Sequence, residues 1–445
     1  MKKIFNPKSI ALIGASEEKN TAGFGLAENI LRGKKDRKIF FINPFQENIL
    51  GEKCFKKIGD IKEKIDLAII AVPAKIVKGV LKECCEKKVG AIIVVSSGFK
   101  EGGNERDEEE IKNIARKYKI PLIGPNCLGI INPSINLNAS FAPLTPKKGN
   151  IAFLSQSGAL LDSVLGMSEE ENIGFSKVVS YGNEADLGLT DFVNYLKDDE
   201  ETKVISIYFE GLKDGRKFME VAKEVVKVKP IIAIKSGRTD KGKEAALTHT
   251  GTLAGDYQIY ESAMKQCGVI LVDTLEELFD SSRALASQER CENGIGIVTN
   301  GGGFGVLAVD YCVEMGIDIP VLSEETISLI EKNKAMGKVI TKNNPLDLIG
   351  DALSDRYEAG MEAMLKQKDI NGLIVISTPQ IMTEHEKNAK IIIEIKKKYP
   401  LKPVVCCFLG GPLVSSAVKM IEESGIPNYP DVKRAVKSIN ALIKK

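Results

Sequence analysis

The stretch SIALIGAS at residues 9–16 places a short apolar run directly before a turn of small residues. The stretches NIAFLSQSG at 150–158 and GIGIVTNGGG at 294–303 have the same form. Such a pattern is typical of a buried strand that leads through a tight turn into a helix. Because the three stretches lie about 140 residues apart, close to the usual size of a domain, we expect each to begin one α/β domain.

The rest of each third alternates in the same way. Further short apolar runs separate Lys/Glu-rich stretches at 38–42, 65–72, 90–95, 120–123, 177–179, 203–209, 230–234, 371–377 and 403–408. Continuous apolar strands between amphipathic helices imply parallel sheets that are covered on both faces. The predicted fold is therefore α/β with three domains, at 1–145, 146–290 and 291–445, and a linker at 142–149.

Composition excludes several classes of protein. The chain has 445 residues, with 62 Lys and Arg against 60 Asp and Glu, so no basic field for nucleic acid covers the whole surface. No apolar run reaches the roughly 18 residues of a membrane span. The nine cysteines show no CxxC spacing, and with two histidines a zinc site is not expected. We expect a reduced, cytoplasmic chain without an export signal, a bound metal, nucleic acid or a membrane.

The first turn is similar to a nucleotide-binding opening but does not have the NAD pattern. A strand, a glycine turn and a helix offer free N–H groups to phosphate. However, Gly14-Ala-Ser16 is not GxGxxG, and the next strand ends in Asn43-Pro44 where NAD sites carry Asp or Glu. This counts against a dehydrogenase. The simpler alternative is that glycine serves only to pack the helix closely on its sheet.

Other small or polar residues follow strands of the same domain. They are Val72-Pro73, Ser96-Ser97-Gly98 and Gly124-Pro125-Asn126-Cys127. Since open α/β sheets bind ligands at the carboxyl ends of their strands, these turns together could hold a long phosphorylated ligand. Cys127 has no histidine near it in the sequence and is more simply a small buried residue than a nucleophile.

One of the two histidines lies in an unusual segment. His249 falls within 236–256, a small, polar and basic stretch that follows the strand at 230–234 and reads as a long irregular loop. A histidine there suits a mobile group carrier, because imidazole nitrogen can attack phosphorus and split one phosphoryl transfer into two. A satisfied structural histidine is the alternative. His385 lies in a charged helical segment and is expected at the surface.

A phosphorylated histidine needs a carboxylate for its second nitrogen and a site for the phosphoryl oxygens. Glu210 ends the strand at 203–209 and can supply the carboxylate. Ser155-Gln156-Ser157-Gly158 opens the helix after the second domain's first strand, where N–H groups and the helix dipole favour phosphate. Asn183, between Gly182 and Glu184, follows another strand and is a further candidate phosphate ligand.

Taken together, these motifs resemble one enzyme family over nearly the whole chain. In order they are IALIGAS at 10–16, SSGFKEG at 96–102, GPNCLG at 124–129, SQSGA at 155–159, YFEG at 208–211, KSGRT at 235–239 and HTGTLAG at 249–255. The set is similar to the α subunits of ADP-forming acetate–CoA ligases, in the succinyl-CoA synthetase superfamily.

The resemblance implies a Rossmann-like CoA-binding domain followed by two flavodoxin-like ligase domains. It makes His249 the phosphorylated residue and Glu210 its stabilising carboxylate, with the phosphate near Ser155, Gln156, Ser157, Gly158 and Asn183. It places CoA at Gly14, Ser16, Val72, Pro73, Ser97 and Asn126. It also implies that ADP or ATP with Mg²⁺ binds a separate ATP-grasp β subunit, in an α2β2 heterotetramer that acts on acyl-CoA, phosphate and a small carboxylic acid.

Two rival functions stay open at this point. A CoA-binding or regulatory protein could use the same fold without turnover, although the presence of both His249 and Glu210 argues against it. An NAD-dependent oxidoreductase is disfavoured by Asn43-Pro44. The acyl group could be acetyl, branched-chain or aryl-acetyl.

Overall fold

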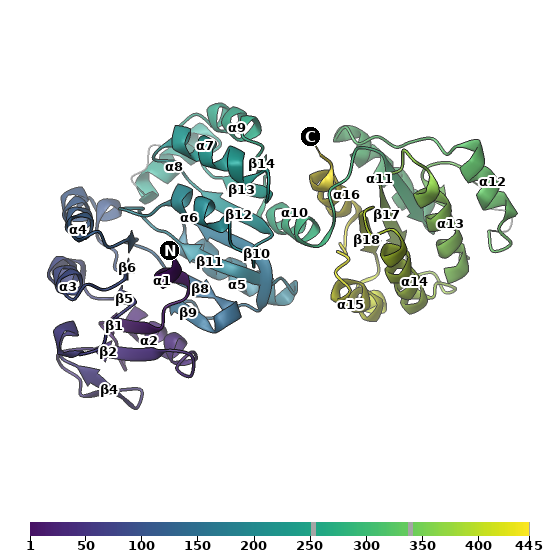
Figure 1. Ribbon diagram of the computed structural model, residues 1–445. Coiled ribbons are helices and arrows are strands. Elements are labelled where there is room, and N and C mark those ends of the chain that lie inside the picture. Colours follow the sequence, from purple (N-terminus) through teal and green to yellow (C-terminus); the bar gives the residue numbers. More distant parts are fainter. Residues whose placement is uncertain (251–254, 337–340, 445) are drawn as a thin grey trace. The chain divides into compact units, whose positions relative to one another are not determined.

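The computed structural model describes residues 1–250, 255–336 and 341–444, with the backbone alone at 247–250 (Figure 1). The chain forms two compact units, Met1–Asp273 and Thr274–Lys445. The first begins with a short helix, α1 (Lys2–Phe5), and holds two sheets. In the described ranges, 3₁₀ turns occur at Ile58–Asp60, Lys100–Gly102, Pro133–Ile135 and Gly411–Val414. No helix in these ranges is long and apolar enough to cross a bilayer.

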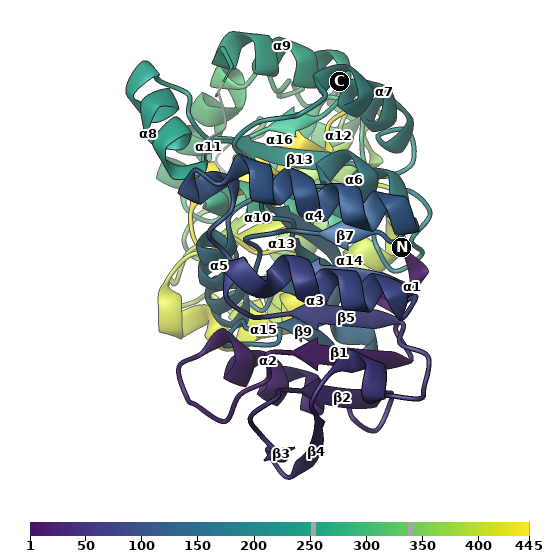
Figure 2. The same cartoon turned by 90° about the vertical axis from the view of Figure 1, so that its left-hand side faces the viewer.

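The first sheet is doubly wound and parallel, as the sequence predicts, except that β3 pairs antiparallel with β4 at one edge. Its order is β3-β4-β2-β1-β5-β6-β7. The strands are β1 (Ser9–Ile13), β2 (Lys38–Ile42), β3 (Asn48–Ile49), β4 (Glu52–Phe55), β5 (Leu67–Ile70), β6 (Ala91–Val94) and β7 (Leu122–Ile123). Helices α2 (Ala22–Leu31), α3 (Ala74–Glu86) and α4 (Glu105–Tyr118) connect them, and Figure 2 shows α3 and α4 lying across the face of the sheet. The strand order reverses between β1 and β5, so a ligand site is expected there.

The second sheet has the order β14-β13-β12-β10-β11-β8-β9. Its parallel strands are β10 (Lys148–Ser155), β11 (Phe175–Ser180), β12 (Val204–Phe209), β13 (Ile231–Lys235) and β14 (Ile270–Leu271). The strands β8 (Gly129–Asn132) and β9 (Leu137–Ser140) pair antiparallel at one edge. Both precede residue 145, so the chain passes from one sheet to the next between β7 and β8, ahead of the expected boundary.

Helices connect the parallel strands of the second sheet, and one of them was not expected. They are α5 (Gly158–Glu170), α6 (Leu189–Leu196), α7 (Gly215–Val225), α8 (Asp240–Thr250) and α9 (Tyr257–Gln266). Helix α8 corrects the prediction of an irregular loop over 236–256. The stretch DKGKEAAL contains Lys, Glu and Ala, which are strong helix formers, and Thr239 Oγ1 accepts a hydrogen bond from Gly242 N at 3.1 Å at the start of the helix.

One hydrophobic core joins the two sheets of the first unit. The same cluster of buried side chains contains Leu12 and Ile69 from the first sheet and Leu154, Val179 and Ile207 from the second. The two sheets therefore have a defined position relative to each other, and a site between them is part of a single folded body.

The second unit is a smaller parallel sheet with the order β16-β15-β17-β18. Its strands are β15 (Ile295–Thr299), β16 (Leu346–Asp347), β17 (Gly372–Ser377) and β18 (Val404–Phe408). Its helices are α10 (Leu275–Ser287), α11 (Gly302–Glu314), α12 (Glu324–Lys332), α13 (Ser354–Lys366), α14 (His385–Lys398), α15 (Ser415–Glu423) and α16 (Val432–Leu442). Helix α10 lies before residue 290, yet it belongs to this unit.

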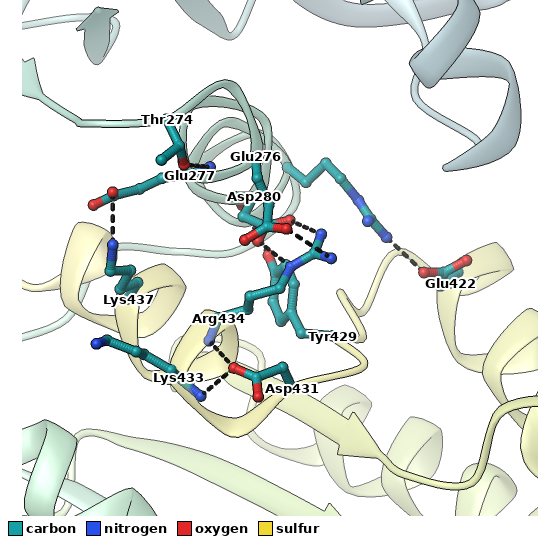
Figure 3. Close-up of polar contacts among 11 residues, drawn as sticks. Thr274, Glu276, Glu277, Asp280, Glu422, Tyr429, Asp431, Lys433, Arg434 and Lys437 are labelled. Carbon is teal, nitrogen blue, oxygen red and sulfur yellow. Dashed lines mark hydrogen bonds and ion pairs between the residues drawn. The ribbon is translucent and has the colours of Figure 1, made fainter.

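Helix α10 is attached to α16 by a buried ion pair (Figure 3). The Arg434 guanidinium donates to both carboxylate oxygens of Asp280, at 2.7 and 2.8 Å, and the Asp280 side chain is only 2% exposed. The Tyr429 hydroxyl donates to the Asp280 carbonyl at 2.8 Å. Nearby, the Lys437 ammonium is 2.8 Å from the Glu277 carboxylate. This clasp explains why α10 packs with the second unit.

Replacing Arg434 with Met should destabilise the packing of α10 on α16 by about 3–5 kcal/mol, because it removes the guanidinium that donates to both oxygens of the buried Asp280 carboxylate. Native-state hydrogen exchange of α10 and α16 measures this free energy of opening. As a control, Lys419→Met removes an exposed charge 3.9 Å from Glu423 and should change stability by less than about 0.5 kcal/mol. An equally small effect in both variants would contradict a structural role for the clasp.

Candidate active site

A cavity of about 420 Å³ lies where the strand ends of the first sheet meet the amino end of α5. Ser97, Asn126 and Cys127 line it from the first sheet. From the second sheet it is lined by Gln156, Ser157, Gly158, Asn183 and Lys213, among others. Six residues that the sequence suggested for CoA or phosphate thus surround one space. They are Ser97, Asn126, Gln156, Ser157, Gly158 and Asn183.

The amino end of α5 has the geometry of an anion site. Ser157 caps the helix, its hydroxyl accepting from Leu160 N at 3.3 Å. Beneath it, Ser155 Oγ accepts from Ser157 N at 3.2 Å and donates to the Ser157 carbonyl at 2.7 Å, so Ser155 shapes the turn without lining the cavity. Gly158 and Ala159 line the cavity in the first turn, where helix N–H groups have no partner in the helix and the dipole is positive. Phosphate is the kind of ligand that such a turn binds.

Gln156 connects α5 to the end of β12. Its backbone N–H donates to the Tyr208 carbonyl at 3.1 Å, and its side-chain Oε1 accepts from Glu210 N at 2.8 Å. Glu210 is only 4% exposed. Gln156 therefore holds the turn at the amino end of α5 and the residue Glu210 in a defined position relative to each other.

Glu210 lies near a buried cation that the sequence analysis missed. Lys235 pairs with Phe209 in the register of β12 and β13 and is 1% exposed. Burial lowers the pKa of the Lys235 ammonium, and the Glu210 carboxylate opposes that fall. The Lys235 ammonium also lies 4.7 Å from the centre of the Tyr260 ring. The available signal was a lysine that ends an apolar strand at the edge where ligands bind.

The structure changes the expectation for both histidines: one lies on a helix and not on a loop, and the other is half-buried and not fully exposed. His249 lies near the end of α8, and its side chain is outside the described residues. His385 begins α14 in the second unit and is half-buried rather than freely solvated. Its Nδ1 is 3.4 Å from Ser377 Oγ and its ring centre is 6.2 Å from that of Phe408. Burial lowers the pKa of His385.

The turn after β1 requires glycine. Gly14 has φ +90°, and a Cβ there would lie 2.2 Å from the Ala71 carbonyl oxygen. Asn43, which argued against NAD, holds the same turn through a 2.9 Å hydrogen bond from its Nδ2 to the Ala15 carbonyl. Its side chain therefore has a structural partner where a dinucleotide site would present a ribose ligand.

The remaining residues suggested for CoA follow the neighbouring strands but do not line the cavity. Ser16 Oγ accepts from Glu18 N at 2.9 Å, and the Val72 carbonyl accepts from Ser96 Oγ at 2.6 Å. Pro73 immediately precedes α3. Together with Gly14 they extend the edge of the first sheet away from the cavity, because β1 and β5 lie beyond β6 in the strand order.

The cysteines do not have the environment of a nucleophile. All nine cysteines are free and buried. Cys127 Sγ is 3.3 Å from the Val94 carbonyl, and burial raises the pKa of this thiol to about 12, which does not suit a nucleophile. Across the described part of the chain, no group of three or more His, Cys, Asp or Glu side chains is arranged to hold a metal ion.

Comparison with known proteins identifies the family. Three family models match successive parts of the chain: a CoA binding domain at 8–133, a succinyl-CoA ligase like flavodoxin domain at 148–285 and a ligase-CoA domain at 295–442. Acetate–CoA ligase [ADP-forming] II subunit alpha of Pyrococcus furiosus is 40% identical over 446 residues, which cover 99% of this chain and 97% of that subunit. The chain belongs to the ADP-forming acetate–CoA ligase family.

Other members of the family agree in sequence and in structure. Acetate–CoA ligase [ADP-forming] of Methanocaldococcus jannaschii is 45% identical over 450 residues, all of this chain but 63% of that protein. The chain thus spans 63% of the length of this relative and of the Archaeoglobus fulgidus ligase I. A solved structure of Ca. Korarchaeum cryptofilum acetyl-coenzyme A synthetase 1 with phosphate and ADP has a TM-score of 0.94 at 39% identity, covering 99% of this chain and 96% of that one.

Gly14→Ala should destabilise the first unit by more than about 1 kcal/mol, because alanine adopts φ +90° poorly and its Cβ would overlap the Ala71 carbonyl. Gly79→Ala is the matched control. Gly79 lies in α3 with nothing within 4 Å of an added Cβ, so this variant should be more stable by about 0.5–1 kcal/mol. Urea unfolding of both variants tests the pair, and a neutral Gly14→Ala would show that the turn tolerates a side chain.

Proposed function

We propose that the chain is the α subunit of an ADP-forming acyl-CoA ligase that interconverts acyl-CoA, ADP and phosphate with a carboxylic acid, CoA and ATP. The observation that carries this proposal is the single cavity lined both by strand ends of the CoA-binding domain and by the amino end of α5. A thioester and a phosphate can meet there. The relatives named acetate–CoA ligase support acetate as the acid.

The first half of the reaction takes place in this cavity. CoA lies along the strand ends at Gly14, Ser16, Val72, Pro73, Ser97 and Asn126, with its thioester in the cavity. Phosphate at Ser157 and Gly158 is held by backbone N–H groups and the α5 dipole. A phosphate oxygen attacks the thioester carbonyl, the C–S bond breaks, and CoA leaves as the thiolate and takes up a proton. The product that stays is an acyl phosphate.

The second half uses His249 as the carrier. One imidazole nitrogen attacks phosphorus, the bond from phosphorus to the acyl oxygen breaks, and the carboxylate leaves. Glu210 accepts a hydrogen bond from the other ring nitrogen, which fixes the tautomer and balances the positive charge that grows on the ring. The burial of Glu210 supports this role, since charges interact more strongly away from water.

The phosphoryl group then passes to ADP on a second protein. We propose an ATP-grasp β subunit, with ADP and Mg²⁺ bound there, in an α2β2 heterotetramer in the cytoplasm. The two Pyrococcus furiosus relatives named subunit alpha, of which the chain covers 97%, support a separate partner. The three family matches support the proposed division into three domains, although β8 and β9, before residue 145, join the second sheet and α10, before residue 290, packs with the second unit.

His249→Asn should abolish phosphorylation of the chain and ATP formation while leaving CoA binding nearly unchanged, because the carrier nitrogen is lost and the CoA-binding strand ends are not. Mass spectrometry after incubation with acetyl-CoA and phosphate detects the acid-labile phosphoryl group, and calorimetry measures CoA binding. His385→Asn is the control and should be phosphorylated normally. Retained ATP synthesis by His249→Asn with the β subunit would overturn the mechanism.

Glu210→Gln should slow phosphorylation of His249 by about ten- to a hundredfold, since a charge-assisted hydrogen bond worth roughly 1.5–3 kcal/mol becomes a neutral one. Glutamine keeps the size of the side chain, so CoA affinity should change little. Rapid-quench measurement of phosphoenzyme formation gives the rate. If the rate equals that of the unchanged chain, Glu210 has no part in the chemistry.

A further inference from the structure

We propose that Asn183 is a positioning residue that holds two walls of the active cavity together, rather than a ligand of phosphate. The identity of the ligands in this cavity rests on the proposed function, whereas the role of Asn183 rests on its hydrogen bonds. Separate measurements test the two.

The segment that carries Asn183 runs along the end of the first sheet. Asn183 N donates to the Pro125 carbonyl at 2.9 Å, Ala185 N to the Gly124 carbonyl at 2.9 Å, and Leu187 N to the Leu122 carbonyl at 3.0 Å. Residues 182–187 therefore run beside β7 and the turn that follows it, joined to them by a ladder of backbone hydrogen bonds. This ladder brings the Asn183 side chain beside the loop that follows β6.

Both N–H donors of the Asn183 side-chain amide are in use. Its Nδ2 donates to Glu101 Oε2 at 2.6 Å and to Glu108 Oε2 at 2.8 Å, and its Oδ1 accepts from Asn126 Nδ2 at 3.2 Å. An amide nitrogen has two hydrogens, and both are taken. The orientation is fixed by the carboxylates, which would repel Oδ1. No donor is left for a phosphate oxygen, and two negative charges lie against the donors that are present.

Through these carboxylates Asn183 orders the opposite wall. Glu101 Oε1 accepts from Gly98 N at 2.6 Å and from Phe99 N at 3.2 Å, while Glu108 Oε2 accepts from Lys100 N at 3.3 Å. The loop shaped by these bonds presents Ser97 and Lys100 to the cavity. Asn183 thus links a loop of the first sheet to a loop of the second.

Lys213 strengthens the same junction from the side of the second sheet. Its ammonium donates to the Asn183 carbonyl at 2.8 Å and also to the Glu184 carbonyl. The positive charge of Lys213 lies near Glu108 and Glu184 and offsets part of their negative charge. The Asn183 side chain is therefore held by carboxylates of the first sheet's loop and helix and its backbone carbonyl by Lys213, which is the arrangement of a structural bridge.

Loss of the bridge should loosen the loop at 97–101 while the anion site at α5 stays intact. In Asn183→Ala, amide exchange at Gly98 and Phe99 should be at least about tenfold faster, because their acceptor Glu101 is no longer held. With the ATP-grasp partner, kcat should fall by about tenfold or more and the KM for phosphate should stay within about twofold. A phosphate ligand would give the opposite split, a raised phosphate KM with unchanged exchange.

Reversing the polarity of one hydrogen bond gives the decisive test. Asn183→Asp removes both donors and adds a third carboxylate, so activity should fall further than in Asn183→Ala. Adding Glu101→Gln restores the pair: the new amide nitrogen at position 101 can donate to the new carboxylate at position 183, and the amide oxygen can still accept from Gly98 N. The double variant should recover at least about tenfold of the lost kcat relative to Asn183→Asp. Asn113→Asp makes the same chemical change on the exposed side of α4 and should have no effect.

The outcomes separate this inference from the proposed function. Recovery in the double variant supports the bridge, because a carboxylate at position 183 could only repel phosphate. No recovery, together with a raised KM for phosphate in Asn183→Ala, overturns it. If the unchanged chain and its partner make no ATP, the proposed function fails. In that case the amide exchange of Asn183→Ala still decides whether Asn183 holds the loop, and unchanged exchange rejects the bridge.

Discussion

The backbone ladder between residues 182–187 and the end of the first sheet is the interaction on which the arrangement of the first unit depends. Parallel sheets present ligand sites at the carboxyl ends of their strands, and here there are two such edges. The ladder aligns one with the other. Gly182 makes the approach possible, because a Cβ there would lie 2.3 Å from the Pro125 carbonyl oxygen. Together with the shared hydrophobic core, this close contact brings the amino end of α5 and the strand ends of the first sheet around one cavity.

Two buried lysines of the second sheet lie at different positions along their strands, and their surroundings differ accordingly. Lys177 lies near the start of β11, is 2% exposed and is paired with Asp199 and Glu201 at 3.3 and 2.6 Å. Lys235 ends β13 and lies beside Glu210 at the ligand-binding edge of the same sheet. Lys177 is paired with two carboxylates and does not line the cavity, so its role is to stabilise the fold of the second sheet. Lys235 lies at the edge where open α/β sheets bind ligands, beside the carboxylate that is proposed to hold the phosphorylated histidine.

Periodicity predicted the long strands well and the short ones poorly. The predicted runs at 9–13, 38–42 and 203–209 correspond closely to β1, β2 and β12. The two-residue strands β3, β14 and β16 were missed, since two residues carry no period, whereas the two-residue strand β7 was predicted because it ends the apolar run at 120–123. The antiparallel pair β8 and β9 was missed although the turn at Gly124-Pro125-Asn126 precedes it, because four residues such as Leu137–Ser140 carry too little apolar pattern to predict a strand.

The residues of the site show a similar limit. Ser97, Asn126 and Ser157 were predicted because each follows an apolar strand, a relation that is local in the sequence. Glu101, Glu108 and Lys213 were missed because each lies in a polar stretch that reads as solvated surface. Their roles come from partners 29 to 82 residues away, to which a single sequence gives no guide.

The clasp on α10 has a consequence for how the gene can be divided. A protein cut at residue 290 would keep α10 on the first fragment, separating Asp280 from Arg434 and uncovering Leu278 and Phe279, which are buried in the intact chain. A cut between Asp273 and Thr274 leaves every one of these contacts within one fragment. The junction at which modules of this architecture can be exchanged, fused or permuted without a loss of solubility is therefore the short connection ahead of α10, and not the glycine-rich strand that follows it.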